Sequence, residues 1–287
     1  MIAFTSPLSW VKNLMWLLKF RRKPKFTYQT IVLTGAASGI GRALLVQWSS
    51  RPLRILAVDI EAEPLVAAVQ SLTAARAEIT PLAIDLSTPE NVDRLFDEAL
   101  KTLGSIDLFV ANAGFAYYEQ LDTADWSRLE RIFRVNVFSP IYAAVKMKSL
   151  NGSRPYKVVI TASAMAYLAL PGYAVYGGTK AALHRFAEGY RLELDDPDRL
   201  VLVYPIATRT HFFAAAGPSI PIPWPVQAAD VVAKAIISGI EQNRRAVYPS
   251  RLFKTYLFLQ RFFPALGAVV QWPDRWKFKR WLRRGKR

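Results

Sequence analysis

The sequence has no cysteine and only two histidines, His184 and His211, among its 287 residues. A disulfide framework and a cysteine nucleophile are excluded. A zinc site would have almost no cysteine or histidine ligands, so we expect no metal at the functional site. The lack of cysteine also fits a reducing, cytoplasm-like compartment. We expect His184 to pack within the fold. His211 falls in the substrate-side loop, where a substrate contact is the less favoured role.

Long hydrophobic runs are also absent near the N-terminus. The apolar stretch Leu8–Phe20 has thirteen residues, whereas crossing a hydrocarbon core of ~30 Å takes about 20. Arg21–Lys23 follow this stretch instead of preceding it, which disfavours a secretory signal peptide. The apolar side chains share one helical face and predict a helix lying in the plane of a membrane surface. They are Leu8, Val11, Leu14, Met15 and Leu18.

Acidic residues are almost missing from the two ends. Residues 1–28 hold six Lys/Arg and no acid, residues 251–287 hold eleven Lys/Arg and the single acid Asp274, and 21 residues of each sign remain in 29–250. Both ends are also aromatic, and Trp alternating with Lys/Arg suits the headgroup region of an anionic membrane. The alternatives are packing of the ends on the body or on a second subunit, and nucleic-acid binding. Nucleic acid is disfavoured because the apolar content exceeds what phosphate contacts require.

This distribution divides the chain into three parts: an amphipathic basic extension (1–28), a body of zero net charge (29–250) and a basic aromatic tail (251–287). Within the tail, Arg261 and Pro264 interrupt the apolar stretch Thr255–Trp272. The interruption predicts a re-entrant or surface-lying hairpin.

A phosphate-binding turn is predicted at the start of the body. Gln29–Leu33 is a short run rich in β-branched residues, Thr34 follows it, and helical spacing begins after Gly41. Gly35 permits a tight turn, Gly39 lets the backbone approach a pyrophosphate, and Gly41 lets the helix pack on the sheet. The helix N-terminus then offers N–H groups and a positive dipole end to phosphate.

Asp59 ends the second expected strand, Arg54–Val58, eighteen residues after Gly41. A carboxylate at this place accepts hydrogen bonds from the adenosine ribose hydroxyls and repels a 2′-phosphate. No Lys or Arg follows in residues 60–62, and Ser38 occupies the loop position where a base could hold that phosphate. The sequence therefore favours NAD over NADP.

Tyr176 and Lys180 lie four residues apart, with Ser163 upstream. Four residues are one helical turn, so the ammonium and the phenol share a helix face. An unperturbed phenol has a pKa of about 10, and a nearby cation favours the phenolate, so we expect Lys180 to lower the pKa of Tyr176. Beside a nicotinamide, such a phenol can exchange a proton with an alcohol or carbonyl oxygen while hydride moves at carbon.

Strand-like and helical segments alternate through the body. The expected strands are residues 29–33, 54–58, 79–84, 107–111, 157–161, 200–204 and 245–248. The expected helices are near 41–50, 62–75, 89–103, 123–149, 175–194 and 228–242. This alternation predicts an α/β fold, a doubly wound parallel sheet of about seven strands with helices on both faces. Asp195, Asp196 and Asp198, beside Pro197, are expected to form a solvated turn.

Together these motifs resemble those of short-chain dehydrogenases/reductases, from about Thr30 to Tyr248. The T-G-x-x-x-G-I-G loop of that family spans Thr34–Gly41. Its remaining motif residues match Asp85, Leu86, Asn112, Ala113, Gly114, Asn136, Ser163, Tyr176 and Lys180. Two features depart from the family pattern. Pro205-Ile206 stands where Pro-Gly is usual, and Y-G-G-T-K replaces the common Y-x-A-S-K.

The resemblance implies a Rossmann-type fold and a division of roles. Tyr176 would be the acid–base and Lys180 would hold the nicotinamide ribose, while Ser163 orients the substrate oxygen and Asn136 positions a water in a proton relay. The implied cofactor contacts are Gly35, Ser38, Gly39, Ile40, Gly41, Asp59, Asp85, Leu86, Asn112, Ala113, Gly114, Tyr176, Lys180 and Thr210. Helices of this family commonly pair subunits, so a homodimer is a further implication.

The segment Arg209–Val226 contains four prolines and many apolar residues. The prolines argue against regular structure, and the apolar content argues against a freely solvated loop. In the family this segment covers the substrate, so the resemblance implies a hydrophobic lid over the substrate site. An ordinary surface loop is the alternative. Its residues would be Phe212, Phe213, Ile220, Ile222 and Trp224.

The sequence thus predicts an NAD-dependent, membrane-associated oxidoreductase acting on a lipophilic alcohol or ketone. Steroids, retinoid-like alcohols and long-chain keto-lipids are the candidate classes. One alternative is an NADPH-dependent reductase of a similar lipid. The other is a catalytically silent, membrane-bound NAD-binding protein.

Overall fold

The computed structural model describes residues 23–217 and 220–285. Its centre is a seven-stranded parallel sheet in the order β3-β2-β1-β4-β5-β6-β9. The strands are β1 (Thr30–Thr34), β2 (Arg54–Asp59), β3 (Glu78–Ala83), β4 (Leu108–Ala111), β5 (Lys157–Thr161), β6 (Leu200–Val203) and β9 (Ala246–Val247). The doubly wound parallel sheet expected from the sequence is confirmed. Its strand order reverses between β1 and β4, and a ligand crevice forms outside the carboxyl ends of the strands at such a point.

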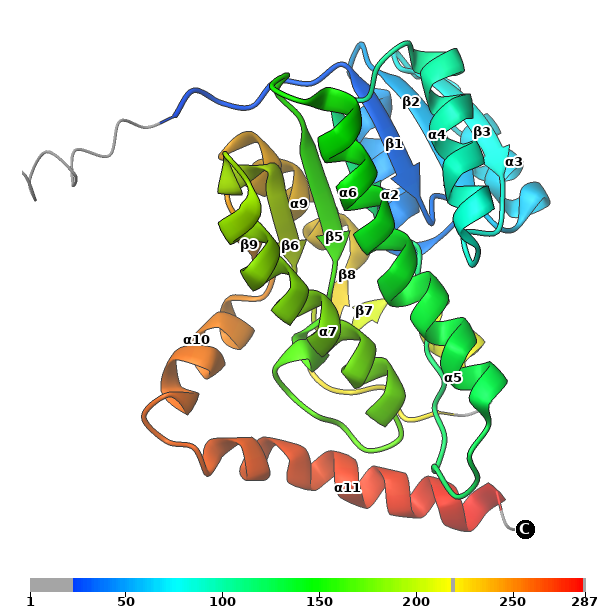
Figure 1. The fold of residues 1–287 in the computed structure, drawn as a ribbon. Coiled ribbons are helices and arrows are strands. Elements are labelled where there is room, and N and C mark those ends of the chain that lie inside the picture. Colours follow the sequence, from blue (N-terminus) through cyan, green and yellow to red (C-terminus); the bar gives the residue numbers. More distant parts are fainter. Residues whose placement is uncertain (1–22, 218–219, 286–287) are drawn as a thin grey trace, which may run out of the picture.

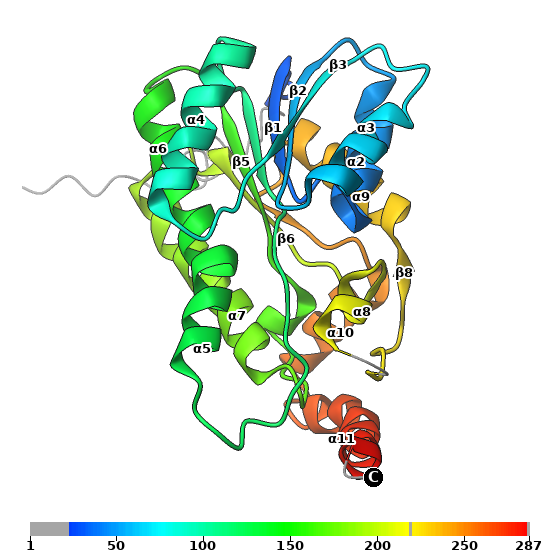
Figure 2. The ribbon, with the colours of Figure 1, turned by 90° about the vertical axis from the view of Figure 1, so that its right-hand side faces the viewer.

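Helices cover both faces of the sheet (Figures 1 and 2). One face carries α2 (Gly39–Ser49), α3 (Ala62–Gln70) and α9 (Ala229–Glu241). The other carries α4 (Pro89–Leu103), α6 (Ser139–Asn151) and α7 (Ala174–Tyr190). Successive strand residues alternate between the two apolar layers: Ile31 and Leu33 of β1 face α2, and Val32 faces the opposite layer.

The helix expected over 123–149 has a local irregularity. α5 (Trp126–Phe133) begins after Asp125, whose carboxylate accepts a hydrogen bond from the Arg128 N–H. A π-helical turn, Arg134–Phe138, then joins α5 to α6. Such turns are frequent at functional sites, and this one buries Asn136 to 1% exposure.

The segment expected to lack regular structure, Arg209–Val226, contains one short helix, α8 (Phe212–Ala216). Two short strands flank the segment, β7 (Thr208–Arg209) and β8 (Gln227–Ala228), and they pair in parallel. The expectation is wrong for α8 because the prolines of the segment all follow this helix in sequence.

The tail forms two helices, α10 (Arg251–Gln260) and α11 (Leu266–Gly285), with Pro264 in the turn between them. α11 crosses the edge of the sheet where the strands end, at the bottom of Figure 1. Its Phe278 and Trp281 pack on Tyr118 of the body, with ring centroids 5.8 and 4.8 Å apart. One face of the tail therefore packs on the body. Among the residues that the structure describes, no helix is both long and apolar enough to cross a membrane.

The basic segment 23–28 lies at the opposite edge, where the strands begin (Figure 1). Lys23 forms ion pairs with Asp196 (3.0 Å) and Asp198 (2.5 Å), and Arg245 contacts Asp198 at 2.7 Å. Asp198 is 7% exposed, so the expectation of a solvated acidic turn is wrong for this residue, because basic side chains enclose it. The helical face predicted over Leu8–Leu18 lies outside the described residues.

Candidate active site

The loop after β1 turns sharply and presents the N-terminus of α2. Gly35 and Gly39 have φ angles of 67° and 56°, a backbone conformation that residues with a Cβ rarely adopt. A Cβ at Gly41 would lie 1.8 Å from the Gly35 carbonyl oxygen. Ser38 precedes α2 without a side-chain cap hydrogen bond in the described structure, and Ile40 packs beneath the helix. The first N–H groups of α2 can therefore receive a phosphate.

Asn112 and Thr34 fasten this loop to β4. The Asn112 amide donates to the carbonyl oxygens of Thr34 and Gly35, at 3.2 Å each. Its oxygen accepts from the Thr161 hydroxyl at 3.1 Å. The Thr34 hydroxyl accepts from the N–H groups of Asn112 and Ala113, at 3.0 Å each. Asn112 supports the loop from beneath, and Thr34 is a residue that sequence reasoning missed although its place at a strand end was a signal.

Asp59 has two tasks in this geometry. Its Oδ2 accepts the Ala37 N–H at 2.9 Å and its Oδ1 accepts the Ile60 N–H at 2.8 Å. The carboxylate therefore orders the glycine loop from the end of β2, where an adenosine ribose is expected.

The remaining predicted cofactor residues lie at the same edge of the sheet. The Asp85 carboxylate accepts the Ser87 N–H at 3.0 Å, and Leu86 is buried. Thr210 lies against the loop, because a Cβ at Gly39 would be 3.0 Å from the Thr210 methyl group.

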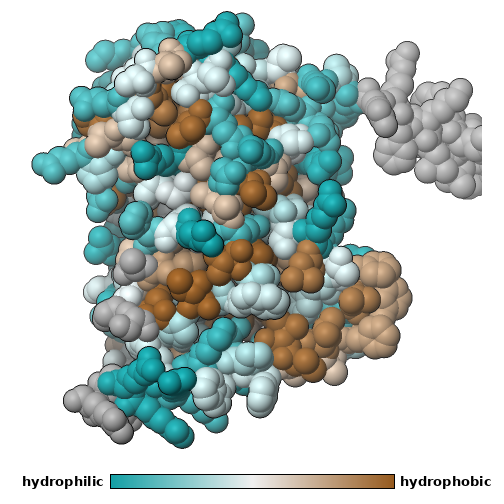
Figure 3. All heavy atoms as spheres, turned by 180° about the vertical axis from the view of Figure 1, so that it is seen from behind, coloured by the Kyte–Doolittle hydropathy of each residue, from teal (hydrophilic) through white to brown (hydrophobic). Residues whose placement is uncertain are grey.

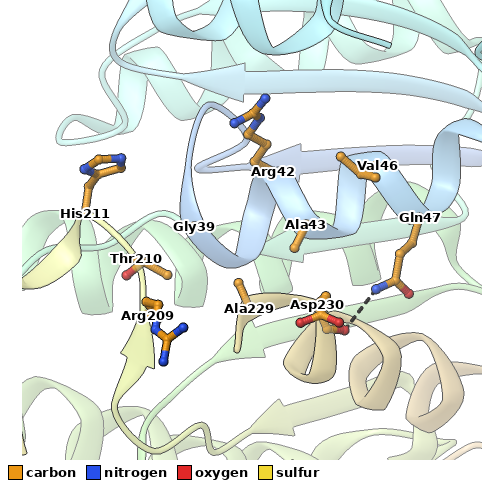
Figure 4. A pocket seen from close by; sticks show the side chains of 10 residues that line it. All are labelled: Gly39, Arg42, Ala43, Val46, Gln47, Arg209, Thr210, His211, Ala229 and Asp230. Carbon is orange, nitrogen blue, oxygen red and sulfur yellow. Dashed lines mark hydrogen bonds between the residues drawn. The ribbon is translucent and has the colours of Figure 1, made fainter. Parts of the chain in front are cut away.

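A hollow of about 580 Å³ opens beside Gly39 and Thr210, between α2 and α9 (Figure 4). Arg42, Arg209 and His211 are among the side chains that line it. His211 is exposed and faces this hollow, next to the phosphate-binding turn.

The four predicted catalytic residues are all buried beyond the ends of β4 and β5. Asn136, Lys180, Tyr176 and Ser163 are 1%, 4%, 7% and 8% exposed. The Lys180 Nζ donates to the Thr161 carbonyl oxygen at 2.8 Å and lies 5.5 Å from the centre of the Tyr176 ring. The structure therefore brings the phenol and the ammonium together. A Cβ at Gly114 would be 3.0 Å from Asn136 Oδ1 and 3.6 Å from Lys180 Nζ, so a glycine here leaves room for both.

Asn136 is held on all sides by protein groups. Its amide nitrogen donates to the Phe115 carbonyl oxygen (2.8 Å) and to the Thr179 hydroxyl (3.2 Å), and its oxygen accepts the Phe115 N–H (3.1 Å). Thr179 in turn donates to the Tyr176 carbonyl oxygen at 2.7 Å. The Asn136 side chain is therefore occupied by protein groups, and a water positioned by Asn136 would have to bind its backbone.

The pKa values of the central pair run against the expectation from sequence. Burial raises the pKa of Tyr176 to about 12, and the Ser163 hydroxyl close to the phenol offsets part of that rise. Burial also lowers the pKa of Lys180 to about 8. The expected lowering for Tyr176 is wrong for this structure because the loss of hydration on burial outweighs the opposing influence of the Ser163 hydroxyl. At neutral pH the phenol therefore holds its proton.

Aromatic side chains cover Tyr176. The Phe212 ring lies 5.4 Å from the Tyr176 ring, and Phe213 and Ile220 belong to the same apolar cluster. Ile222 and Trp224 are 50% and 78% exposed. The lid expectation is wrong for these two, because the chain turns away from the cluster toward β8.

Short-range contacts place Ser163 and the Pro205-Ile206 pair. The Ser163 hydroxyl accepts the Met165 N–H at 3.1 Å, and the Ala164 N–H donates to the Pro205 carbonyl oxygen at 2.8 Å. Ile206 packs against the core layer of α4, α6 and α7. The bulkier residue is thus accommodated while Thr210 keeps its contact with the glycine loop. The second histidine, His184, hydrogen bonds to the Tyr204 hydroxyl at 2.8 Å through Nδ1.

Comparisons with known proteins agree with this geometry. A family model described as short chain dehydrogenase matches residues 29–219. The "11-beta-hydroxysteroid dehydrogenase-like 6" of Arabidopsis thaliana is 28% identical over 269 residues, covering 86% of this chain and 76% of the relative. A short-chain dehydrogenase from Sphingobium yanoikuyae in complex with NADPH has a TM-score of 0.72 at 23% identity, covering 84% of this chain and 93% of that one. A short-chain dehydrogenase/reductase from Burkholderia phymatum in complex with NAD has a TM-score of 0.74 at 22% identity, covering 84% and 96%.

Proposed function

Because the chain belongs to the short-chain dehydrogenase/reductase family, a family of oxidoreductases acting on alcohol and carbonyl groups, we propose an NAD(H)-dependent enzyme for a lipophilic alcohol or ketone. Tyr176 is its general acid–base. One observation carries the proposal: Tyr176, Lys180, Ser163 and Asn136 are buried together within reach of the glycine loop.

The residues present fit a dinucleotide. The glycine loop and the N-terminus of α2 would hold the pyrophosphate, Asp59 the adenosine ribose and Lys180 the nicotinamide ribose. The cofactor supplies or accepts the hydride. Tyr176, protonated at neutral pH, donates a proton to a carbonyl oxygen in reduction, and the adjacent Ser163 hydroxyl orients that oxygen. In oxidation the Tyr176 phenolate accepts the alcohol proton, so the rate in that direction is expected to rise with pH.

The lipophilic substrate class has two supports. Apolar and aromatic side chains pack around Tyr176 beside the polar catalytic groups, which suits a hydrocarbon skeleton. The Arabidopsis relative is named as a hydroxysteroid dehydrogenase. A panel of steroid, retinoid-like and long-chain alcohols in detergent, with NAD and NADP side by side, tests the proposal. Turnover of lipophilic members is expected, and cofactor binding without turnover of any member would favour the catalytically silent alternative.

Asp59→Asn should shift cofactor preference from NAD toward NADP. The substitution removes the charge that repels a 2′-phosphate but keeps an oxygen that can accept the Ala37 N–H. Titration of both cofactors measures the ratio of the two dissociation constants. Asp85→Asn is the matched control and should leave that ratio near the wild-type value. A wild-type protein that already binds NADP more tightly than NAD contradicts the assignment.

We further propose that α10 and α11 rest on a lipid surface. Hydrophobic side chains gather at their turn, at the lower right of Figure 3. The most exposed of the large ones are Phe258, Phe262, Phe263, Val269, Trp272 and Trp276, with exposures of 59–71%. Ten of the eleven basic residues of the tail either lie within five sequence positions of one of these side chains or follow Trp276. This mixture of basic and apolar residues suits an anionic headgroup layer.

The two basic ends leave the body at opposite edges of the sheet (Figure 1). A flat membrane against α11 therefore does not reach segment 23–28 directly. Membrane contact of the N-terminal end would therefore rest on residues 1–22. Contact of both ends with one membrane stays part of the proposal, with the described contact surface at α10 and α11.

Sedimentation with anionic liposomes tests this surface. High salt should weaken but not abolish binding of the full-length protein, because screening removes only the Lys/Arg contribution. A Phe262→Ser, Phe263→Ser double variant should lose most binding in high salt, since each buried Phe contributes about 1.5–3 kcal/mol. Leu192→Ser is the control, because Leu192 is 89% exposed in the short 3₁₀ turn that follows α7, away from the tail. Binding that disappears in salt for the wild type, or that the double variant retains, contradicts the model.

We also propose a homodimer, because apolar side chains are exposed on α6 and on the residue before it. Phe138, Tyr142 and Val145 are 56%, 39% and 48% exposed and recur at helical spacing, which forms one apolar stripe. Sedimentation equilibrium measures the state, and a monomer at micromolar concentration contradicts it.

A further inference from the structure

The hydroxyl of Tyr173 is buried without a hydrogen-bond partner. The residue is 2% exposed, and in the described part of the chain no group pairs with its hydroxyl oxygen. Native proteins satisfy the large majority of buried polar side-chain atoms, and an unpaired one destabilises the fold. The Tyr190 and Tyr256 hydroxyls are also unpaired in the described structure, so the position of Tyr173 beside the active site is what points to a function.

The position of Tyr173 connects it with the catalytic centre. It stands three residues before Tyr176, and the two ring centroids are 6.2 Å apart. Tyr118 lies 4.8 Å away and Phe213 of the lid lies 6.5 Å away. Burial raises the pKa of the Tyr173 phenol, and Tyr118 and Tyr176 raise it further. The hydroxyl therefore stays protonated and can both donate and accept a hydrogen bond.

Aromatic side chains close the tail side of the Tyr173 region. Gly172 has a φ angle of 83°, and a Cβ there would lie 2.3 Å from the Tyr118 ring. Tyr118 therefore rests directly on the backbone next to Tyr173. Phe278 and Trp281 of α11 pack on Tyr118 from the tail side. A molecule that enters beside Tyr176 can supply a polar partner from the opposite side.

We propose that Tyr173 binds a second oxygen of the substrate, near the group that Tyr176 protonates or deprotonates. The substrate class is then a lipophilic alcohol or ketone that carries a further hydroxyl or carbonyl group. The inference rests on the proposed function. A site with a buried polar group discriminates strongly against analogues that cannot pair with it.

Paired substrates and two variants test the inference. The substrates are a lipophilic secondary alcohol and a series of diols and ketols of the same skeleton, with the second oxygen placed at successive carbons. In the wild type, kcat/KM should be highest for one of the doubly oxygenated members. In Tyr173→Phe, the preference for that member over the mono-alcohol should fall about tenfold, mainly through KM. Tyr190→Phe is the control, because the Tyr190 hydroxyl is also buried and unpaired in the described structure but lies at the far end of α7. It should keep the wild-type preference.

Thermal unfolding of the cofactor-free protein gives a second readout. Tyr173→Phe should have a Tm equal to or above that of the wild type, because only an unpaired hydroxyl is removed. A lower Tm would mean that the hydroxyl serves the fold, through Tyr118 or through Asp274 of α11, and would overturn the inference. So would a wild-type preference near one, or one that Tyr173→Phe leaves intact. Failure to turn over any member of the series contradicts the proposed function instead. The Tm comparison then shows whether the Tyr173 hydroxyl serves the fold.

Discussion

Tyr176→Phe should lower kcat by about 10³-fold, within the range that general acid–base catalysis contributes, while leaving cofactor binding close to the wild-type value. The phenol is buried, holds its proton at neutral pH and lies next to the Ser163 hydroxyl, so it is the group placed to donate to a carbonyl oxygen. Phenylalanine keeps the ring contacts with Phe212 and Tyr173 and removes the exchangeable proton. Steady-state kinetics on the best substrate of the panel, with cofactor titration in parallel, measures both effects.

Lys180→Ala should differ from Tyr176→Phe by affecting cofactor binding as well as turnover. Lys180 is expected to contact the cofactor ribose as well as to stand beside the phenol, so its loss should weaken cofactor binding and turnover together. Tyr176→Phe turnover within tenfold of the wild type would remove Tyr176 from the mechanism.

Gly41→Ala should be the most damaging small substitution in the cofactor loop. The added Cβ would lie 1.8 Å from the Gly35 carbonyl oxygen and 2.9 Å from the Asn112 amide nitrogen. Neither the backbone nor the braced amide can yield without moving the loop. Overpacking of this kind destabilises by about 1–3 kcal/mol, and a loop displaced by ~1 Å should cost about 10²-fold in turnover. Cofactor affinity and denaturant unfolding measure the two parts.

Gly189→Ala is the matched control for that substitution. Gly189 lies in α7 with open space around its Cβ position, so alanine should stabilise the helix by about 1 kcal/mol. Kinetics should stay unchanged. A Gly41→Ala protein that binds cofactor as tightly as Gly189→Ala would show that the loop does not hold the pyrophosphate.

Local sequence patterns predicted the parts of the site that depend on spacing. The turn at Gly35–Gly41 follows from a strand, glycines and a helix in succession, and the shared face of Tyr176 and Lys180 follows from the helical period. The seven-stranded sheet followed from alternating elements, since each strand and helix has its own periodicity. Short-range physics determines all of these.

Features that depend on distant contacts were missed. The burial of Asp198 results from its encounter with Lys23 and Arg245, which sequence spacing does not reveal. The direction of the Tyr176 pKa shift depends on burial among Phe212, Tyr173 and their neighbours, so the Lys180 spacing alone gave the wrong sign.

The aromatic enclosure of Tyr173 was missed for a similar reason. It forms only because α11 returns across the carboxyl edge of the sheet to place Phe278 and Trp281 on Tyr118. No local pattern in the tail indicates that return.

Isotope transfer tests the central claim most directly. Full-length protein in detergent at alkaline pH, where Tyr176 loses its proton more readily, is incubated with NAD and a lipophilic secondary alcohol from the panel that carries deuterium at the carbinol carbon, and the reduced nicotinamide is analysed by mass spectrometry. The account predicts one deuterium in the reduced cofactor with the wild type, and almost no reduced cofactor with Tyr176→Phe. Reduced cofactor without the label, or equal labelling by Tyr176→Phe, would contradict it.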